Sequence, residues 1–149
     1  NPAFPKKQLV GVFSLELARQ YGYLYQNTVK DFLILHSLDG YDEVSLTGPV
    51  KFFYNGGEKI LEPSDFGLGQ LGHHDIKGGE SVEASAKIFV DVLENRGTDA
   101  QRNAVIANAA MALYAANQDD GLPAAVSRAR EALISGKAHN AFKNMIEAQ

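Results

Sequence analysis

Three carboxylates, Asp39, Asp42 and Glu43, are clustered directly after the apolar run at residues 31–36. Such a run is typical of a buried strand, and open α/β sheets bind ligands beyond the carboxyl ends of their strands. Carboxylate oxygens there suit Mg²⁺, which proteins commonly hold through one or two carboxylates together with substrate phosphates. The alternative is a solvated turn in which these side chains bond to nearby backbone.

A second candidate is glycine-rich. Gly67, Gly69 and Gly72 have the G-x-G-x-x-G spacing of dinucleotide-binding loops. That motif needs a strand before it and a helix after it, so that pyrophosphate meets the helix N-terminus. Here Pro63-Ser64-Asp65 precedes the glycines and no helical pattern follows them. We therefore favour a flexible loop with coincidental glycines.

The histidines give weaker signals. His73-His74-Asp75 resembles a metal site, but adjacent histidines usually point apart, and no further nitrogen or sulfur ligand has a suitable spacing. We interpret this segment as a solvated loop and His36, at the end of the apolar run, as a hydrogen-bonded histidine near the core. No serine lies in a strand-to-helix elbow, so nothing indicates a Ser-His-Asp triad.

Residues 78–80, Gly-Gly-Glu, lead into a predicted helix. Backbone N–H groups at a helix start can hold an anion. Alternatively, Ser81 or Glu80 simply caps the helix.

The elements around these candidates predict an α/β fold. Residues 8–13 form an expected strand, and Ser14 caps a helix that ends near Asn27. The helix buries the face made by Leu17, Ala18, Tyr21, Leu24 and Tyr25. With the strand at 31–36, this is a βαβ unit with parallel strands.

The second half predicts a hairpin and then helices. Strands at 50–54 and 59–61 flank the turn Asn55-Gly56-Gly57, and residues 64–79 form an irregular loop. Four helices follow, and the last of them is short. The buried stripes expected for the first three are Val82, Ala86, Phe89, Val90 and Leu93; Val105, Ala109, Ala112, Leu113 and Ala116; and Val126, Ala129 and Leu133. Pro123 suits the first turn of the third helix, and Gly136 its C-terminal end.

Composition excludes several classes of protein. The 149 residues suit one domain, and the absence of cysteine excludes disulfides and thiolate metal sites. The net charge of −4 argues against a nucleic-acid partner. No apolar run approaches the roughly 20 residues that cross a bilayer. Because the chain begins at Asn1 without a signal-peptide pattern, we expect a cut piece or processed product.

The order of the motifs resembles one family, anthranilate phosphoribosyltransferase. The segments that carry the resemblance are Asn1-Pro2-Ala3, residues 8–12, residues 38–45, Thr47-Gly48-Pro49, residues 63–68, Gly78-Gly79, Asn108-Ala109-Ala110, Leu113-Tyr114 and residues 135–138. Together they cover essentially the whole chain. The resemblance implies a partial large domain of the nucleoside phosphorylase/phosphoribosyltransferase type, with a central sheet, packed helices and a β-hairpin.

The resemblance also implies an activity. The family transfers phosphoribosyl from phosphoribosyl pyrophosphate to anthranilate in tryptophan biosynthesis, as a cytoplasmic homodimer. Its Asp-Glu pair, here Asp42 and Glu43, binds the Mg²⁺ that accompanies the pyrophosphate. No catalytic side chain within this chain is implied, and its substrate-binding residues stay open. No nucleic acid or membrane partner is expected.

The match is to the C-terminal part of the family's α/β domain, residues 1–149 here. The family's helical domain, pyrophosphate loop and anthranilate-contacting arginine would lie upstream, so we expect the isolated chain to be inactive. Two departures, Ser85 in place of Asn and Val50 in place of Thr, concern close substrate contacts. Alternatives are a non-catalytic or nucleic-acid-binding relative of the same fold, and a nucleoside phosphorylase-like enzyme.

Overall fold

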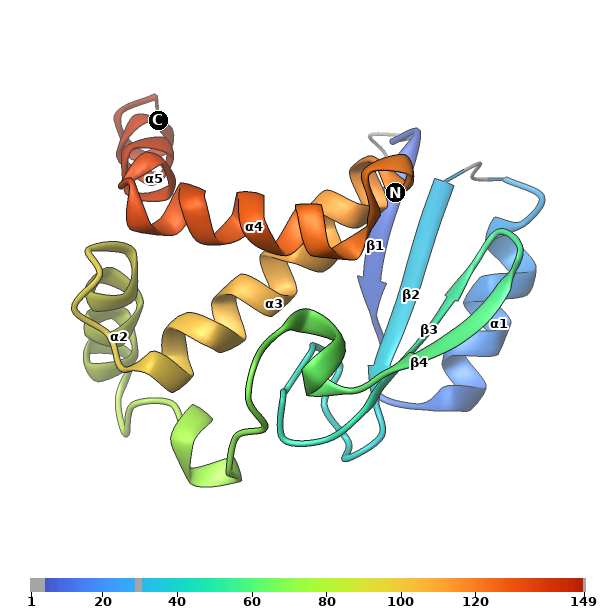
Figure 1. Cartoon of the computed structure of the whole chain (residues 1–149), viewed down its shortest axis with the longest axis horizontal. Coiled ribbons are helices and arrows are strands. Elements are labelled where there is room, and N and C mark those ends of the chain that lie inside the picture. The colour runs from blue at the N-terminus through green and yellow to red at the C-terminus, as the bar shows by residue number, and fades with distance from the viewer. Residues whose placement is uncertain (1–4, 29–30, 149) are drawn as a thin grey trace.

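The computed structural model describes residues 5–28 and 31–148, and these residues include a four-stranded sheet (Figure 1). The strands are β1 (Lys7–Gly11), β2 (Asp31–Ser37), β3 (Val50–Tyr54) and β4 (Gly57–Leu61), in that spatial order. β1 and β2 are parallel, whereas β3 pairs antiparallel with both β2 and β4. The predicted parallel strand pair and the hairpin are therefore confirmed.

Helix α1 (Leu15–Tyr25) covers one face of this sheet. The Ser14 hydroxyl accepts a hydrogen bond from the backbone N–H of Leu17, so the predicted cap is present. Ala18 is fully buried against the strands. Leu24, predicted to be inside, is 58% exposed. At 3.6 residues per turn it lies on the side of the helix turned away from Ala18.

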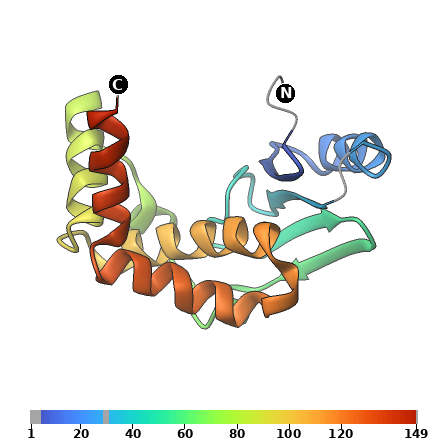
Figure 2. The same cartoon turned by 90° about the horizontal axis from the view of Figure 1, so that it is seen from above.

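Helices α3 (Asp99–Ala116) and α4 (Gly121–Ile134) cover the other face. α3 runs between the sheet and α4 (Figure 2). Its buried residues are Ile106, Ala107, Ala110, Met111 and Ala115, so the predicted stripe through Val105, Ala112 and Ala116 is wrong. An alanine-rich helix that is covered on two sides has little hydrophobic contrast between its faces. In α4 the predicted Val126, Ala129 and Leu133 are buried, and Gly136 follows the helix with a φ of 75°.

Helices α2 (Val82–Leu93) and α5 (Lys137–Glu147) stand side by side, away from the sheet (Figure 2). The rings of Phe89 and Phe142 meet edge to face with centroids 5.0 Å apart. The predicted stripe of α2 is only partly right, because Val82 is 81% exposed and Val92 is its buried residue. Only the C-terminal part of α2, at Ile88, Val92 and Leu93, packs against the core.

Short 3₁₀ helices at Pro63–Phe66, His73–Ile76 and Gln118–Asp120 complete the fold. The first of these overlaps the segment 64–79 and the second lies within it, so this segment is not irregular throughout as predicted. The Asn1-Pro2-Ala3 motif lies outside the described residues. Within residues 5–28 and 31–148, no helix combines the length and apolar character needed to traverse a bilayer.

The packing of Phe52 in the core leads to a prediction about stability. Phe52 is buried, and its ring lies 6.4 Å from that of Tyr114 in α3. Phe52→Ala should lower the free energy of unfolding by about 3–5 kcal/mol, since it removes apolar contacts and leaves a cavity. Urea denaturation measures this. The matched control is Phe13→Ala, because Phe13 is 74% exposed and its removal should change stability by only about 0.5 kcal/mol. Equal effects of both changes would contradict the assigned core.

Candidate functional site

The acidic turn, residues 39–43, follows the end of β2 directly. The backbone N–H of Ser37 donates to the carbonyl of Tyr41 at 2.8 Å, and that of Gly40 donates to the carbonyl of Ser37 at 2.9 Å. Gly40 has a φ of 104°, a conformation that a side chain disfavours. The turn thus closes on the strand end, and Asp39, Asp42 and Glu43 are all exposed there, as predicted.

One of the three carboxylates is occupied by the turn itself. Asp39 accepts hydrogen bonds from the hydroxyl of Ser45, at 3.2 and 3.1 Å to its two oxygens, and from the hydroxyl of Thr47. The Ser45 hydroxyl oxygen also accepts from the backbone N–H of Thr47 at 3.1 Å. Asp39 therefore matches the structural alternative. Asp42 and Glu43 remain as the carboxylates available for a ligand.

Asn108 of α3 holds the backbone immediately after this pair. Its side-chain oxygen accepts from the N–H of Val44 at 2.9 Å, and its side-chain NH₂ donates to the carbonyl of Val44 at 2.8 Å. The same NH₂ group also donates to the carbonyl of Ala104 at 2.9 Å, within the helix. One amide thus fixes Val44 relative to α3, and Glu43 is the residue before it.

Gly11, at the end of β1, fixes the other side of the turn. A Cβ atom at this position would stand 1.8 Å from the carbonyl oxygen of Asp42, closer than atoms can approach. Only glycine lets the turn lie this close to the strand. The backbone around Asp42 and Glu43 is therefore held by β1 on one side and by α3 on the other.

The chain leaves the turn through a strained residue. Leu46 has a φ of 59° and a fully buried side chain. Its carbonyl accepts from the N–H of Leu71 at 2.9 Å. A left-handed conformation in a non-glycine residue costs about 1–3 kcal/mol. Burial of the leucine side chain, about 1.5–3 kcal/mol, offsets this and keeps the segment in place.

The two free carboxylates influence each other. Partial shielding of the Glu43 carboxylate from water raises its pKa, and a hydrogen bond with Asp42 and the negative charge of Asp42 raise it further. A divalent cation would reduce this repulsion between negative charges. Within residues 5–28 and 31–148, no three His, Asp or Glu side chains gather to hold a metal unaided. A pair of carboxylates fits Mg²⁺ completed by water and phosphate oxygens.

Space for a ligand lies beside the pair. A cavity of about 560 Å³ extends from Tyr41 and Glu43 along α3 past Val105 and Asn108. At its rim the ring of Tyr41 stacks on His73, with centroids 6.0 Å apart and planes inclined by 21°. The acidic turn therefore opens onto a hollow of small-molecule size.

The prediction for His36 is confirmed, whereas His73 and His74 are exposed on a short 3₁₀ helix and not in the predicted loop. Nδ1 of His36 donates to the carbonyl of Val12 at 2.8 Å, and the residue is buried. His74 lies 3.1 Å from Asp75, whereas His73 stacks on Tyr41, so the adjacent histidines have separate partners.

Neither glycine-rich candidate forms a phosphate loop. Residues 67–72 lie between two short 3₁₀ helices, without the required strand and long helix, so the dinucleotide interpretation fails. Within this connection, the side chain of Gln70 donates to the carbonyl of Thr47 at 2.8 Å, and the N–H of Leu71 donates to the carbonyl of Leu46 at 2.9 Å. Near Gly79, Ser81 is the residue that caps α2, and its hydroxyl accepts from the N–H of Ala84 at 3.1 Å. Ser85 donates to the carbonyl of Gly79 at 3.4 Å.

No role was predicted for Asn108 or Gly11. Both residues lie in segments that resemble the anthranilate phosphoribosyltransferase family. Neither side chain is a metal ligand. An asparagine inside an alanine-rich helix was a usable signal, because its amide disfavours the helix interior unless it bonds elsewhere. Gly11 offered none, because its contact is with a residue 31 positions away.

Known proteins resemble this chain in sequence and in fold. Residues 1–139 match the glycosyl transferase family, a/b domain. The chain is 55% identical over 145 residues to an anthranilate phosphoribosyltransferase of Christiangramia forsetii, and 51% identical over 145 residues to that of Flavobacterium psychrophilum. Each match covers 97% of this chain but 44% of the relative. The chain thus spans less than half the length of these curated relatives.

Solved structures of similar fold include two enzymes of the same name. The one from Thermus thermophilus has a TM-score of 0.82 at 29% identity, over 90% of this chain and 40% of that one. The one from Saccharomyces cerevisiae, in complex with PRPP and Mg, has a TM-score of 0.85 at 23% identity, over 95% and 41%. The latter likeness concerns the fold. The sheet, its helices and the family match over most of the sequence place the chain in the glycosyl transferase family, as part of its a/b domain.

Proposed function

We propose that this chain is the C-terminal part of the α/β domain of an anthranilate phosphoribosyltransferase. The complete protein would transfer phosphoribosyl from phosphoribosyl pyrophosphate to anthranilate in tryptophan biosynthesis. The names and identities of the relatives from Christiangramia and Flavobacterium support the reaction. The observation that carries the proposal is the Asp42–Glu43 pair, which is exposed on a rigidly held turn beside a cavity.

The chemistry of such a transfer explains why this pair is needed. The bond between the sugar carbon and pyrophosphate breaks, and the amine nitrogen of anthranilate bonds to that carbon. Mg²⁺, when bound, supplies positive charge that stabilises the leaving pyrophosphate. Asp42 and Glu43 would hold this ion, while Asn108 and Gly11 keep their backbone in place. The structure of the yeast enzyme with PRPP and Mg supports magnesium as the ion.

The remainder of the protein would supply the rest of the active site. The pyrophosphate loop, the helical domain and the dimer contacts would belong to the part of the relatives that this chain does not span. The complete enzyme would act as a cytoplasmic homodimer.

The carboxylate pair is tested in the complete protein. Asp42→Ala or Glu43→Ala should lower kcat/KM about a hundredfold, since charge stabilisation by a metal is worth several kcal/mol and each 1.36 kcal/mol is tenfold in rate. Added Mg²⁺ should restore part of the activity. The control is Asp119→Ala, which removes an exposed carboxylate from the 3₁₀ helix Gln118–Asp120. Unchanged activity in both site variants would refute the assignment.

Asn108 is tested as a positioning residue. Asn108→Ala leaves the N–H and carbonyl of Val44 without their partner, which should lower the free energy of unfolding by about 1–3 kcal/mol. Loss of such support for a metal ligand typically weakens metal affinity about 10–100-fold. Activity should therefore need more Mg²⁺ for half-saturation, whereas kcat at saturating Mg²⁺ recovers. Asn144→Ala, at an exposed site on α5, is the control. A loss of stability with an unchanged Mg²⁺ requirement would show a purely structural role.

The proposal also predicts the activity of the isolated chain. The isolated 149-residue chain should have no measurable transferase activity, because it would lack the pyrophosphate loop and the acceptor contacts. Anthranilate fluorescence follows the reaction continuously. Turnover at a rate comparable with that of the complete enzyme would contradict the assignment of this chain to one part of the active site.

A further inference from the structure

The sequence contains a single Asn-Gly pair, and this pair forms the turn of the β3–β4 hairpin. Asn55 and Gly56 alone connect the two strands, because Tyr54 and Gly57 are partners in the strand register. Both turn residues are exposed to solvent. Asparagine is among the chemically labile residues of proteins. The turn therefore presents a labile side-chain amide to water, directly before a glycine.

The backbone nitrogen of Gly56 is hydrogen-bonded within the turn. Its N–H donates to the carbonyl of Tyr54, two residues earlier, at 2.8 Å. A bond of this span belongs to a γ-turn and lies outside the ladder that joins β3 to β4. Exposed turns open locally at little cost in free energy, so this bond can break while the strands stay paired. The nitrogen thus becomes free to react without unfolding of the hairpin.

Glycine at position 56 also leaves this nitrogen unshielded. A Cβ atom there would stand 3.0 Å from Cε2 of the Tyr54 ring, a tight contact that would restrict the turn. Without a Cβ, the backbone reaches conformations that are closed to other residues. The Gly56 nitrogen is therefore able to approach the side chain of Asn55.

We propose that Asn55 is a site of spontaneous deamidation in the folded protein. The Gly56 nitrogen loses its proton and bonds to Cγ of Asn55. The bond between Cγ and Nδ2 breaks, and the side-chain amide leaves as ammonia, which takes up the proton. Water then opens the cyclic succinimide at either carbonyl carbon and gives aspartate or isoaspartate. The reaction consumes only water.

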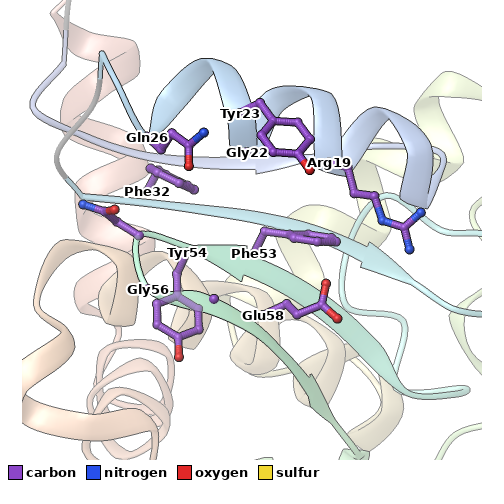
Figure 3. Close-up of a pocket in the computed structure, with 11 residues that line it drawn as sticks. Arg19, Gly22, Tyr23, Gln26, Phe32, Phe53, Tyr54, Gly56 and Glu58 are labelled. Carbon is purple, nitrogen blue, oxygen red and sulfur yellow. The ribbon is translucent and has the colours of Figure 1, made fainter.

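Either product changes the cleft beside the hairpin. This cleft has a volume of about 510 Å³ and is lined by Asn55. Figure 3 shows Arg19 of α1 on one side of it and Glu58 of β4 on the other. Deamidation adds a second negative charge to these walls. Isoaspartate also lengthens the backbone of the turn by one carbon, and turn length fixes the register of a hairpin. The site is separate from the acidic turn and does not depend on the proposed reaction.

The test follows Asn55 and Asn140 in the complete protein at mildly alkaline pH. Asn140 is exposed on α5 and is the matched control. Trypsin releases the two residues within peptides 52–59 and 138–143, and neither peptide contains another amide side chain. Mass spectrometry then measures the conversion of each amide to an acid. In the folded protein Asn55 should convert at least about tenfold faster than Asn140, a difference of about 1.4 kcal/mol in activation free energy.

The same measurement in urea separates the effect of the fold from that of the sequence. Asn55 should convert in the folded protein within about tenfold of its rate in the unfolded chain, since the native turn leaves the reaction open. Folding should slow Asn140 more strongly, because the hydrogen bonds of α5 hold the backbone nitrogen that follows it.

Two variants locate the reaction. Gly56→Ala should slow the conversion of Asn55, and its melting temperature shows whether it is folded. Asn55→Gln keeps an amide but requires a larger ring, so peptide 52–59 should then stay unconverted over the same period. The Asp42→Ala variant should deamidate as the unmodified protein does, so a failure of the proposed function leaves this result readable. Conversion of Asn55 no faster than that of Asn140 in the folded protein, or an equal rate in folded Gly56→Ala, would overturn the proposal.

Discussion

Burial of β2 on both faces is the constraint on which the rest of this structure depends. Every residue from Phe32 to Ser37 is buried, so each face of the strand needs its own cover. Phe32 and Ile34 pack with α1, whereas Leu33 and Leu35 join the core under α3 and α4. The β3–β4 hairpin extends the same sheet on one side. Because β2 is packed on both faces, the position of the turn at its carboxyl end is well defined.

Hydrogen bonds between polar groups hold the acidic turn in place at the end of β2. Ser37, still part of β2, donates its hydroxyl to the carbonyl of Glu43 at 2.5 Å. Asp39, Ser45 and Asn108 satisfy the neighbouring backbone and hydroxyl groups, and no buried side-chain polar atom within the described ranges lacks a partner. These bonds hold the turn without using the side-chain carboxylates of Asp42 and Glu43. The two carboxylates are thus held close together, and the negative charge of Asp42 raises the pKa of Glu43.

Local sequence signals located most elements well and their buried faces less well. Ser14 as a cap, Gly136 after α4 and the turn at Asn55-Gly56-Gly57 act through neighbouring backbone, and all three predictions are confirmed. The stripes of α2 and α3 went partly wrong because burial depends on which elements arrive from elsewhere. Val82 is as apolar as Val92, but only Val92 reaches the core.

The sequence by itself determined the element types, the parallel strand pair and the position of an acidic turn after a buried strand, because these follow from periodicity and local backbone preferences. The tertiary structure alone decided which carboxylates are free. Asp39 is engaged by Ser45 and Thr47, while Asn108 and Gly11 hold the turn from residues far away in the chain. Close approach and side-chain hydrogen bonding are properties of distances in space, and spacing along the chain does not encode them.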